Sequence, residues 1–312
     1  FERHVQAALD LLPPQLAMPA AHISYMDGTD RITAVSAARG ADIAIVFAVK
    51  PSAESVDNPA LDLPDQQNDL IDAVARANSQ TIVVLETGNA VIMPWVDLVP
   101  SIVAAWYPGQ RGAEALAAIL SGRISPSGRS PISWPRRVDD LPRPRLPGWR
   151  PDVGVDLAVG KRPDPFDINY FEGADVGYRW HQRSGCPPLF PFGRGLTYGK
   201  FEYSDLKAAI DRSGQLVLVF YLHNVGQRAA TEVPQAYVAE QGRTHRLVAW
   251  DRVSLQPGEK RMVRLRADRR VMAAYGAAGW RPFDGLLDIV VGAEAGQAAL
   301  YSRVPARGLR LR

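Results

Sequence analysis

The feature that most constrains the fold is a change of sequence pattern near residue 134. Up to that point, segments with helical spacing alternate with short apolar runs, and the run at residues 42–48 is continuous and rich in β-branched side chains. Continuous apolar runs are typical of strands covered on both faces, and strands separated by helices indicate crossovers in a mostly parallel sheet. The first part is therefore predicted to be an α/β sandwich with a mostly parallel sheet.

The pattern places individual elements in this first part. Helices are expected at residues 1–12, 30–39, 64–78 and 112–120, and strands at residues 22–26, 42–48, 81–85, 101–106 and 131–134. The parallel strands and their crossover helices would bury their apolar sides against one another. We expect this α/β domain to cover residues 1–134.

After residue 200 the strands become shorter and turn signals become frequent. Asn224-Val-Gly226 and Gln256-Pro-Gly258 are two such signals. Strands are expected at residues 216–222, 233–239, 252–255, 260–266 and 286–291. Short strands with Pro/Gly turns predict an all-β antiparallel sandwich of about 100 residues. We assign residues 201–312 to this second domain.

Between the two domains the sequence loses its periodicity. Seven prolines fall between Pro135 and Pro165, mixed with arginines and aspartates. Such composition predicts an extended Pro/Arg-rich connector over residues 135–200, without long regular helices.

Composition excludes several classes of protein. At 46% hydrophobic and 22% charged residues the chain can bury a core, and its single Cys186 excludes a disulfide framework. No apolar stretch approaches ~20 residues, so no membrane-spanning helix is expected. The 36 basic residues are scattered and balanced by 33 acidic ones, which argues against a nucleic-acid partner.

Metal and cofactor motifs are likewise missing from the sequence. The five histidines show no pair at ligand spacing, so no metal site is predicted. The glycines at 122 and 128 have the spacing of a phosphate loop, but Arg129 and Ser130 follow them, and the segment lies between a helix and a strand. No Gly-x-Gly-x-x-Gly motif follows a strand. We expect no cofactor.

Carboxylates are the remaining candidates for chemistry. Residues 50–64 form a long loop after the strongest strand, and ligands of parallel sheets bind beyond the carboxyl ends of strands. Glu54 lies in the middle of this loop, and Glu86 at the end of the next strand has an equal topological claim. Local spacing alone favours a solvated Glu54, with Asp57 and Asp62 as turn residues or helix caps.

Longer motifs carry a family resemblance. The sequence resembles glycoside hydrolase family 3 in its C-terminal portion, and its last part is similar to that family's fibronectin type III-like domain. The motifs occur in order over nearly the whole chain. They are Glu54-x-x-Asp57-(x)5-Leu63-Pro-x-x-Gln-x-x-Leu70-Ile, Leu85-x-Thr-Gly-Asn-x-Val-x-Met-Pro-Trp95, Ala105-Trp-Tyr-Pro-Gly-Gln110, Ser125-Pro-Ser-Gly-Arg-x-Pro131, Leu189-Phe-Pro-Phe-Gly-x-Gly-Leu-x-Tyr198, Asn224-Val-Gly-x-Arg-Ala, Glu232-Val-Pro-Gln-x-Tyr237 and Leu255-x-Pro-Gly-Glu259.

The resemblance implies a retaining, exo-acting β-glycosidase of the β-glucosidase type. In such enzymes an Asp nucleophile lies in an N-terminal (β/α)8 barrel, and a Glu acid/base comes from a loop of the following α/β domain. The family's Glu falls on Glu54. This chain has Ser55 and Asn58 where the family often has Gly and Arg, a departure that concerns the loop conformation and sugar contacts rather than the carboxylate.

The resemblance also implies a missing part. The sequence contains no barrel and no nucleophile motif, and the family's first strand is not found ahead of Phe1. We therefore expect the N-terminal barrel segment of the same protein to be a partner on a separate chain, and the 312-residue chain to be inactive alone. The substrate would be a β-glycoside or oligosaccharide, and a polysaccharide substrate favours a periplasmic or secreted location. The alternative is a non-catalytic carbohydrate-associated structural or binding module.

Overall fold

The computed structural model describes residues 22–54, 58, 60–148 and 165–310. The chain divides into two compact units, each described separately below. The first comprises Phe1–Ile124 and Pro135–Phe171, and the second comprises Ser125–Trp134 and Glu172–Arg312. This division does not follow the expected boundaries at residues 134 and 200. The expected helix at residues 1–12 lies outside the described residues.

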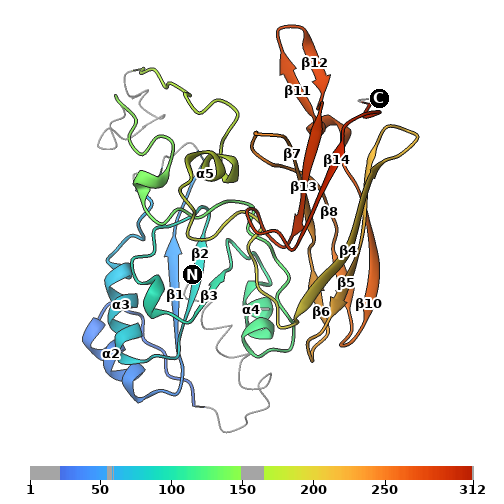
Figure 1. The fold of residues 1–312 in the computed structure, drawn as a ribbon. Coiled ribbons are helices and arrows are strands. Elements are labelled where there is room, and N and C mark those ends of the chain that lie inside the picture. Colours follow the sequence, from blue (N-terminus) through green and yellow to red (C-terminus); the bar gives the residue numbers. More distant parts are fainter. Residues whose placement is uncertain (1–21, 55–57, 59, 149–164, 311–312) are drawn as a thin grey trace. The chain divides into compact units, whose positions relative to one another are not determined.

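The first unit alternates helices and strands, as the sequence predicts. Its α-helices and strands, labelled in Figure 1, are α2 (Arg31–Gly40), β1 (Ala44–Lys50), α3 (Gln67–Ala77), β2 (Thr81–Thr87), β3 (Ser101–Ala104) and α4 (Gly112–Leu120). Two short 3-10 helices, η1 (Val96–Leu98) and η2 (Val138–Asp140), complete the described elements.

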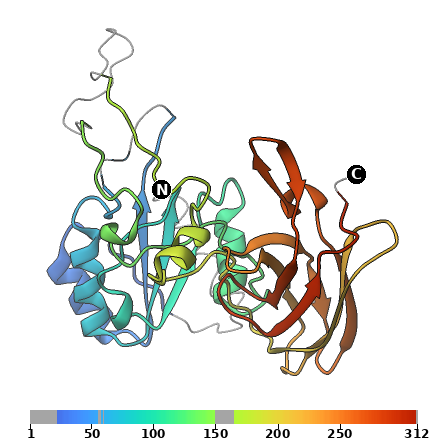
Figure 2. The same ribbon diagram turned by 45° about the horizontal axis from the view of Figure 1, so that its top comes forward.

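A parallel sheet forms the centre of the first unit. Among the described residues it has the order β1-β2-β3, with Ala48 opposite Leu85 and Val84 opposite Val103. The central strand β2 is buried along nearly its whole length, as its continuous apolar sequence predicts. Helices α2 and α3 lie side by side, and the strands lie between them and α4 in both Figure 1 and Figure 2. The carboxyl ends of the three strands therefore meet at one edge of the sheet.

The buried end of α3 fixes α2 in place. Asn78 follows α3 and donates from Nδ2 to the carbonyls of Ala38 and Ala41, at 2.9 and 2.8 Å. Ala38 then packs with Ala44 of β1 and Val74 of α3 in one small apolar cluster. A polar side chain that satisfies two carbonyls at a helix end replaces hydrogen bonds that the helix itself cannot supply.

Two expected strands of the first part are wrong. Residues 22–26 are extended but exposed and pair with no strand among the described residues. Residues 131–134 do not join the parallel sheet, because Trp134 pairs antiparallel with Phe190 instead. Its indole nitrogen also donates to the Ser130 hydroxyl at 2.9 Å. The backbone pairing with Phe190 thus places this segment outside the parallel sheet.

The second unit consists mainly of antiparallel strands. Its elements are α5 (Tyr178–Ser184), β4 (Phe201–Ile210), β5 (Leu216–Asn224), β6 (Ala230–Glu232), β7 (Gln235–Glu240), β8 (Arg246–Trp250), β9 (Val253–Leu255), β10 (Lys260–Arg266), η3 (Arg269–Met272), β11 (Ala273–Gly276), β12 (Gly279–Pro282), β13 (Leu286–Gly292) and β14 (Leu300–Pro305). Within the described part of residues 135–200, the helical segments are the short η2 and α5.

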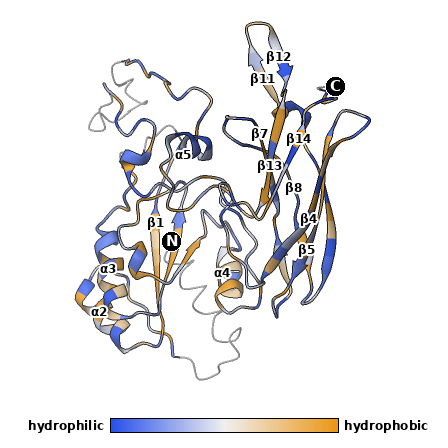
Figure 3. Ribbon diagram, in the orientation of Figure 1, coloured by the Kyte–Doolittle hydropathy of each residue, from blue (hydrophilic) through white to orange (hydrophobic). Residues whose placement is uncertain are grey.

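Two antiparallel sheets enclose the core of the second unit. One has the order β10-β5-β4 and the other β14-β13-β7-β8. Their inner faces contribute fully buried side chains such as Phe220 and Ile289. Figure 3 shows hydrophobic residues along β1 of the first unit and along β13 of the second. Alternation of buried and exposed residues along β10 matches a strand with one face toward the core.

Candidate active-site loop

The loop that carries Glu54 is held where it leaves the sheet by a buried lysine. Lys50 ends β1 and is only 5% exposed. Its Nζ donates to the backbone carbonyls of Ala60 and Asp62, the second at 3.0 Å. Burial lowers the pKa of Lys50 below its ordinary value. A buried ammonium requires such acceptors, so the lysine ties the returning part of the loop to the strand.

The same loop is held where it enters α3 by a glutamine. The side chain of Gln67 accepts the Val49 N–H at 2.8 Å and donates to the Val49 carbonyl at 2.9 Å. It also donates to the Pro64 carbonyl at 3.0 Å. The amide therefore forms a pair of hydrogen bonds with the backbone of Val49 on β1, just before the loop begins. Both ends of the loop are fixed by side chains from regular elements.

Segments after all three parallel strands meet beside this loop. The Tyr107 hydroxyl, which follows β3, donates to the Lys50 carbonyl at 2.6 Å and lies 2.9 Å from the Ser52 hydroxyl. Gly88, which follows β2, has no room for a side chain, because a Cβ there would lie 2.8 Å from the Ser52 hydroxyl and 2.9 Å from the Tyr107 ring. The region is built by close contact of three connections at the carboxyl end of the sheet.

The structure separates the candidate carboxylates by their exposure. Glu54 is exposed two residues beyond the Ser52–Tyr107 contact, whereas Glu86 is buried at the end of β2. Asp62 is exposed and uses its backbone carbonyl to bind Lys50. Asp57 lies outside the described residues. The exposed Glu54 is therefore open to solvent on a loop whose ends are fixed, whereas Glu86 is buried in the first unit.

The Met-Pro-Trp motif supports the first unit structurally. Trp95 is fully buried, and its indole N–H donates to the Asn68 side chain on α3 at 2.8 Å. The N–H of Ile92 donates to the Leu61 carbonyl at 3.0 Å. The motif therefore holds the loop after β2 against both α3 and the Glu54 loop. Its role in bracing was not evident from the sequence.

Three other motifs meet in the second unit. Arg129 forms a buried ion pair with Glu232 at 2.5 Å. Gly195 lies against the same segment, and a Cβ on it would be 2.1 Å from the Gly128 carbonyl oxygen. The Ser125 hydroxyl lies 2.7 Å from that of Thr197. The motifs near residues 125–131, 189–198 and 232–237 thus contact one another within the second unit.

No metal cluster or membrane span is found in the described part of the chain. The described residues hold no group of three or more His, Cys, Asp or Glu side chains suited to a metal. None of their helices has the length and apolar character to cross a bilayer.

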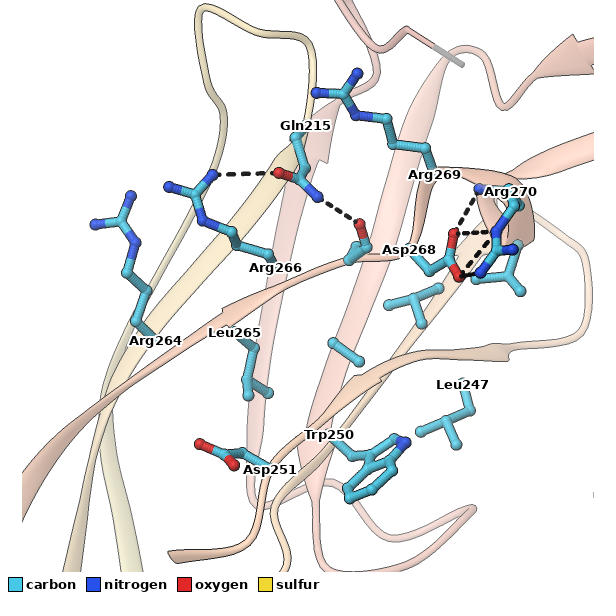
Figure 4. A pocket seen from close by; sticks show the side chains of 14 residues that line it. Gln215, Leu247, Trp250, Asp251, Arg264, Leu265, Arg266, Asp268, Arg269 and Arg270 are labelled. Carbon is cyan, nitrogen blue, oxygen red and sulfur yellow. Dashed lines mark hydrogen bonds and ion pairs between the residues drawn. The ribbon is translucent and has the colours of Figure 1, made fainter. Parts of the chain in front are cut away.

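A large groove in the second unit carries two carboxylates, Asp251 and Asp268, among its described lining residues. It measures about 720 Å³ and is lined by β8 and by the residues from Arg264 to Val271. Figure 4 shows Arg266 directed toward Gln215, Arg270 directed toward Asp268, and Trp250 at the opposite end. The Asp268 carboxylate is held by Arg270 at 2.6 Å. This arrangement keeps the carboxylate in a surface ion pair.

Comparison with known proteins defines the family. The family described as the glycosyl hydrolase family 3 C-terminal domain matches residues 10–198, and the fibronectin type III-like domain matches residues 232–295. The chain therefore belongs to glycosyl hydrolase family 3, as its C-terminal part.

Individual relatives agree with this assignment. The chain is 34% identical over 284 residues to the thermostable beta-glucosidase B of Acetivibrio thermocellus, covering 87% of this chain and 36% of that protein. It is 34% identical over 276 residues to beta-glucosidase B of Emericella nidulans, covering 83% and 32%. The crystal structure of DesR, a beta-glucosidase from Streptomyces venezuelae in complex with D-glucose, superimposes with a TM-score of 0.78 at 36% identity, covering 88% of this chain and 35% of that one. The chain thus spans about a third of the length of these relatives.

Proposed function

We propose that this chain is the C-terminal part of a retaining, exo-acting β-glycosidase in which Glu54 is the catalytic acid/base. The observation that carries the proposal is an exposed Glu54 on a loop fixed by Lys50 and Gln67, in a family whose named relatives are beta-glucosidases. The nucleophile Asp would come from the N-terminal barrel segment of the same protein on a separate chain.

The chemistry follows from pairing two carboxyl groups. In a retaining glycosidase they lie ~5–5.5 Å apart, and one attacks the anomeric carbon while the other protonates the leaving oxygen. Glu54 would first donate its proton to that oxygen and then accept a proton from the hydrolytic water. The bracing of its loop limits the positions available to the carboxyl group, which favours both proton transfers.

The substitution Glu54→Ala in the full-length protein tests this role. Natural β-glucosides with poor leaving groups should lose on the order of 10²–10⁴ in rate, because a positioned general acid contributes that much. Aryl glucosides with acidic phenols leave without protonation, so their first step should be nearly spared. Added azide should then accelerate turnover and yield a β-glucosyl azide. Steady-state kinetics and product analysis measure both effects.

Asp62→Asn is the matched control, because Asp62 is an exposed acid in the same loop and its hydrogen bond with Lys50 uses its backbone carbonyl, which the substitution keeps. This variant should keep the wild-type rate on both substrates. The 312-residue chain without the barrel segment should show no turnover. A Glu54→Ala protein that hydrolyses cellobiose at close to the wild-type rate would refute the assignment. Full-length protein without any glycosidase activity would favour the non-catalytic carbohydrate-associated module.

A further inference from the structure

A second cavity of the second unit has four arginines among its nine described lining residues. It measures about 290 Å³ and lies between α5, the β7–β8 turn and Phe283. At ~30 Å³ for a water, it has room for about ten water molecules, or for a small anion with part of its hydration shell. The charged side chains among its described lining residues are Arg179, Arg183, Arg243, Arg246, Asp175 and Glu240.

On one side of the cavity, two arginines share one aspartate. Arg179 and Arg183 approach the Asp175 carboxylate at 2.6 and 3.5 Å. The same carboxylate accepts the Thr244 hydroxyl proton at 2.9 Å. Because one negative charge faces two guanidinium groups, this side of the cavity keeps an excess of positive charge.

On the other side, two arginines share one glutamate. Arg281 and Arg243 approach the Glu240 carboxylate at 2.8 and 3.3 Å, and the Asp284 N–H donates to it at 2.9 Å. Burial acts to raise the pKa of Glu240, but the hydrogen bonds from Arg281 and Asp284 lower it below its ordinary value. The carboxylate is therefore ionised and fully engaged by its neighbours.

Arg246 adds a further positive charge between these two groups. Its guanidinium donates to the backbone carbonyls of Val271 and Ala273, at 3.4 and 2.6 Å, and lies over the Phe283 ring. Burial lowers the pKa of Arg246, and the neighbouring Arg179 lowers it further. The described lining of the cavity thus holds four guanidinium groups and two carboxylates, which leaves an excess of positive charge.

We propose that this cavity is a binding site for a tetrahedral oxyanion, phosphate or sulfate, either free or esterified to a sugar. Guanidinium groups bind such oxygens in pairs of charge-assisted hydrogen bonds, and four of them line this half-open cavity. The rim arginines, Arg183 and Arg243, are about half or more exposed, so an anion can reach the site from solvent. The site lies wholly within the second unit and is independent of the glycosidase proposal.

Titration of the full-length protein with inorganic phosphate tests the site. Isothermal calorimetry should show saturable binding that sodium chloride at equal ionic strength does not reproduce. In the double variant Arg183→Gln/Arg243→Gln the dissociation constant should rise at least tenfold, because two positive charges leave the cavity rim. Asp175 and Glu240 each keep one arginine partner in this variant, so the fold is expected to persist.

The double variant Arg264→Gln/Arg266→Gln is the matched control. It removes the same charge from the exposed groove of Figure 4 and should leave phosphate binding unchanged. Absence of saturable binding, or an equal loss in both double variants, would overturn the proposal. Should the rim variant fail to fold, the single change Arg243→Gln, at a side chain that is 64% exposed, answers the same question.

A parallel titration with glucose 6-phosphate separates the two sources of the anion. Tighter binding of the ester than of inorganic phosphate would identify a sugar-borne group as the ligand. Equal or weaker binding of the ester would identify the free anion. In either case the Arg183→Gln/Arg243→Gln variant should bind the anion at least tenfold more weakly than the wild type.

Discussion

At the scale of single residues, the family motifs contain more structural anchors than ligand contacts. Trp95 is buried and bonded to α3, Gly195 leaves room for a carbonyl, and Arg129 is paired inside the second unit. Glu54 differs from all of them because its side chain is exposed. Recurrence of a residue in a family pattern therefore does not by itself indicate chemistry, and exposure on a fixed loop is the additional criterion.

Asp211 shows how one carboxylate shapes a turn. Asp211 lies in the turn between β4 and β5. Its carboxylate accepts hydrogen bonds from the Ser213 N–H at 2.9 Å, the Ser213 hydroxyl at 2.6 Å and the Gln215 N–H at 3.1 Å. The hydrogen bond from the Ser213 hydroxyl contributes most to lowering the pKa of Asp211, and the one from the Gln215 N–H comes next. Together with smaller contributions they bring the pKa from 3.8 to about 2. The ionised form is therefore favoured in the folded protein.

Stability of the second unit should follow the titration of this aspartate. Because the folded pKa is depressed, its contribution is present above pH 3.8 and is lost as the pH falls through about 2. Asp211→Asn keeps an acceptor oxygen but does not titrate. Urea unfolding from pH 5 to pH 2 should show the wild type more stable than the variant at pH 5 and the gap closing toward pH 2. A constant gap over this range would contradict the prediction.

At the scale of elements, the Glu54 loop depends on contacts from the regular structure around it. Lys50 of β1 and Gln67 of α3 each form hydrogen bonds at one end of the loop. Gly88, which directly follows β2, leaves room for Ser52 of the loop.

Lys50→Met removes one of these anchors. The variant keeps an apolar stem but leaves the Ala60 and Asp62 carbonyls without their donor, which should cost about 1–3 kcal/mol in the free energy of unfolding. Urea denaturation of the full-length protein measures this loss. Lys207→Met, at an exposed position of β4, should change stability by no more than about 0.5 kcal/mol. Equal stability of the two variants would show that Lys50 does not anchor the loop.

Periodicity predicted the elements that bury a continuous apolar surface. The helix expected at residues 112–120 is α4 with the same bounds, and the strand expected at residues 260–266 is β10. Strands β8 and β14 were not expected, because β8 is only five residues long and β14 carries Ser302 and Arg303 within it. Their places in the sheet are set by pairing with β7 and β13, which local sequence does not reveal.

The candidate loop was predicted in part for a similar reason. A long loop after β1 with a carboxylate in it follows from the strand pattern, and the choice of Glu54 rested on the family resemblance. The contacts of Tyr107 and Gly88 with Ser52 join residues far apart in sequence. No local spacing signals such contacts, so only the folded arrangement of the three connections shows them.

At the scale of the whole molecule, each compact unit is assembled from two separate stretches of chain. Ser125–Trp134 belongs to the second unit although first-unit residues flank it on both sides. The ion pair of Arg129 with Glu232 fixes this insertion, and both side chains are less than 10% exposed. Breaking a buried pair leaves an uncompensated charge, whereas replacing both partners with apolar groups does not.

Arg129→Met should therefore destabilise the second unit by about 3–5 kcal/mol. The double variant Arg129→Met/Glu232→Met should recover most of that loss, because no buried charge remains. Urea denaturation of both proteins, followed by tryptophan fluorescence, completes the comparison. A double variant as unstable as the single one would show that the pair contributes through packing rather than charge.

The interleaving of the two units also sets an order of assembly during synthesis. Arg129 and Glu232 are 103 positions apart, so at ~5–20 residues per second the arginine waits on the order of 5–20 seconds for its partner to be made. The strands of residues 44–104 are complete before that interval begins. A translation product that stalls before residue 232 would therefore carry all three parallel strands, while Ser125–Trp134 would still lack the glutamate that neutralises its buried arginine.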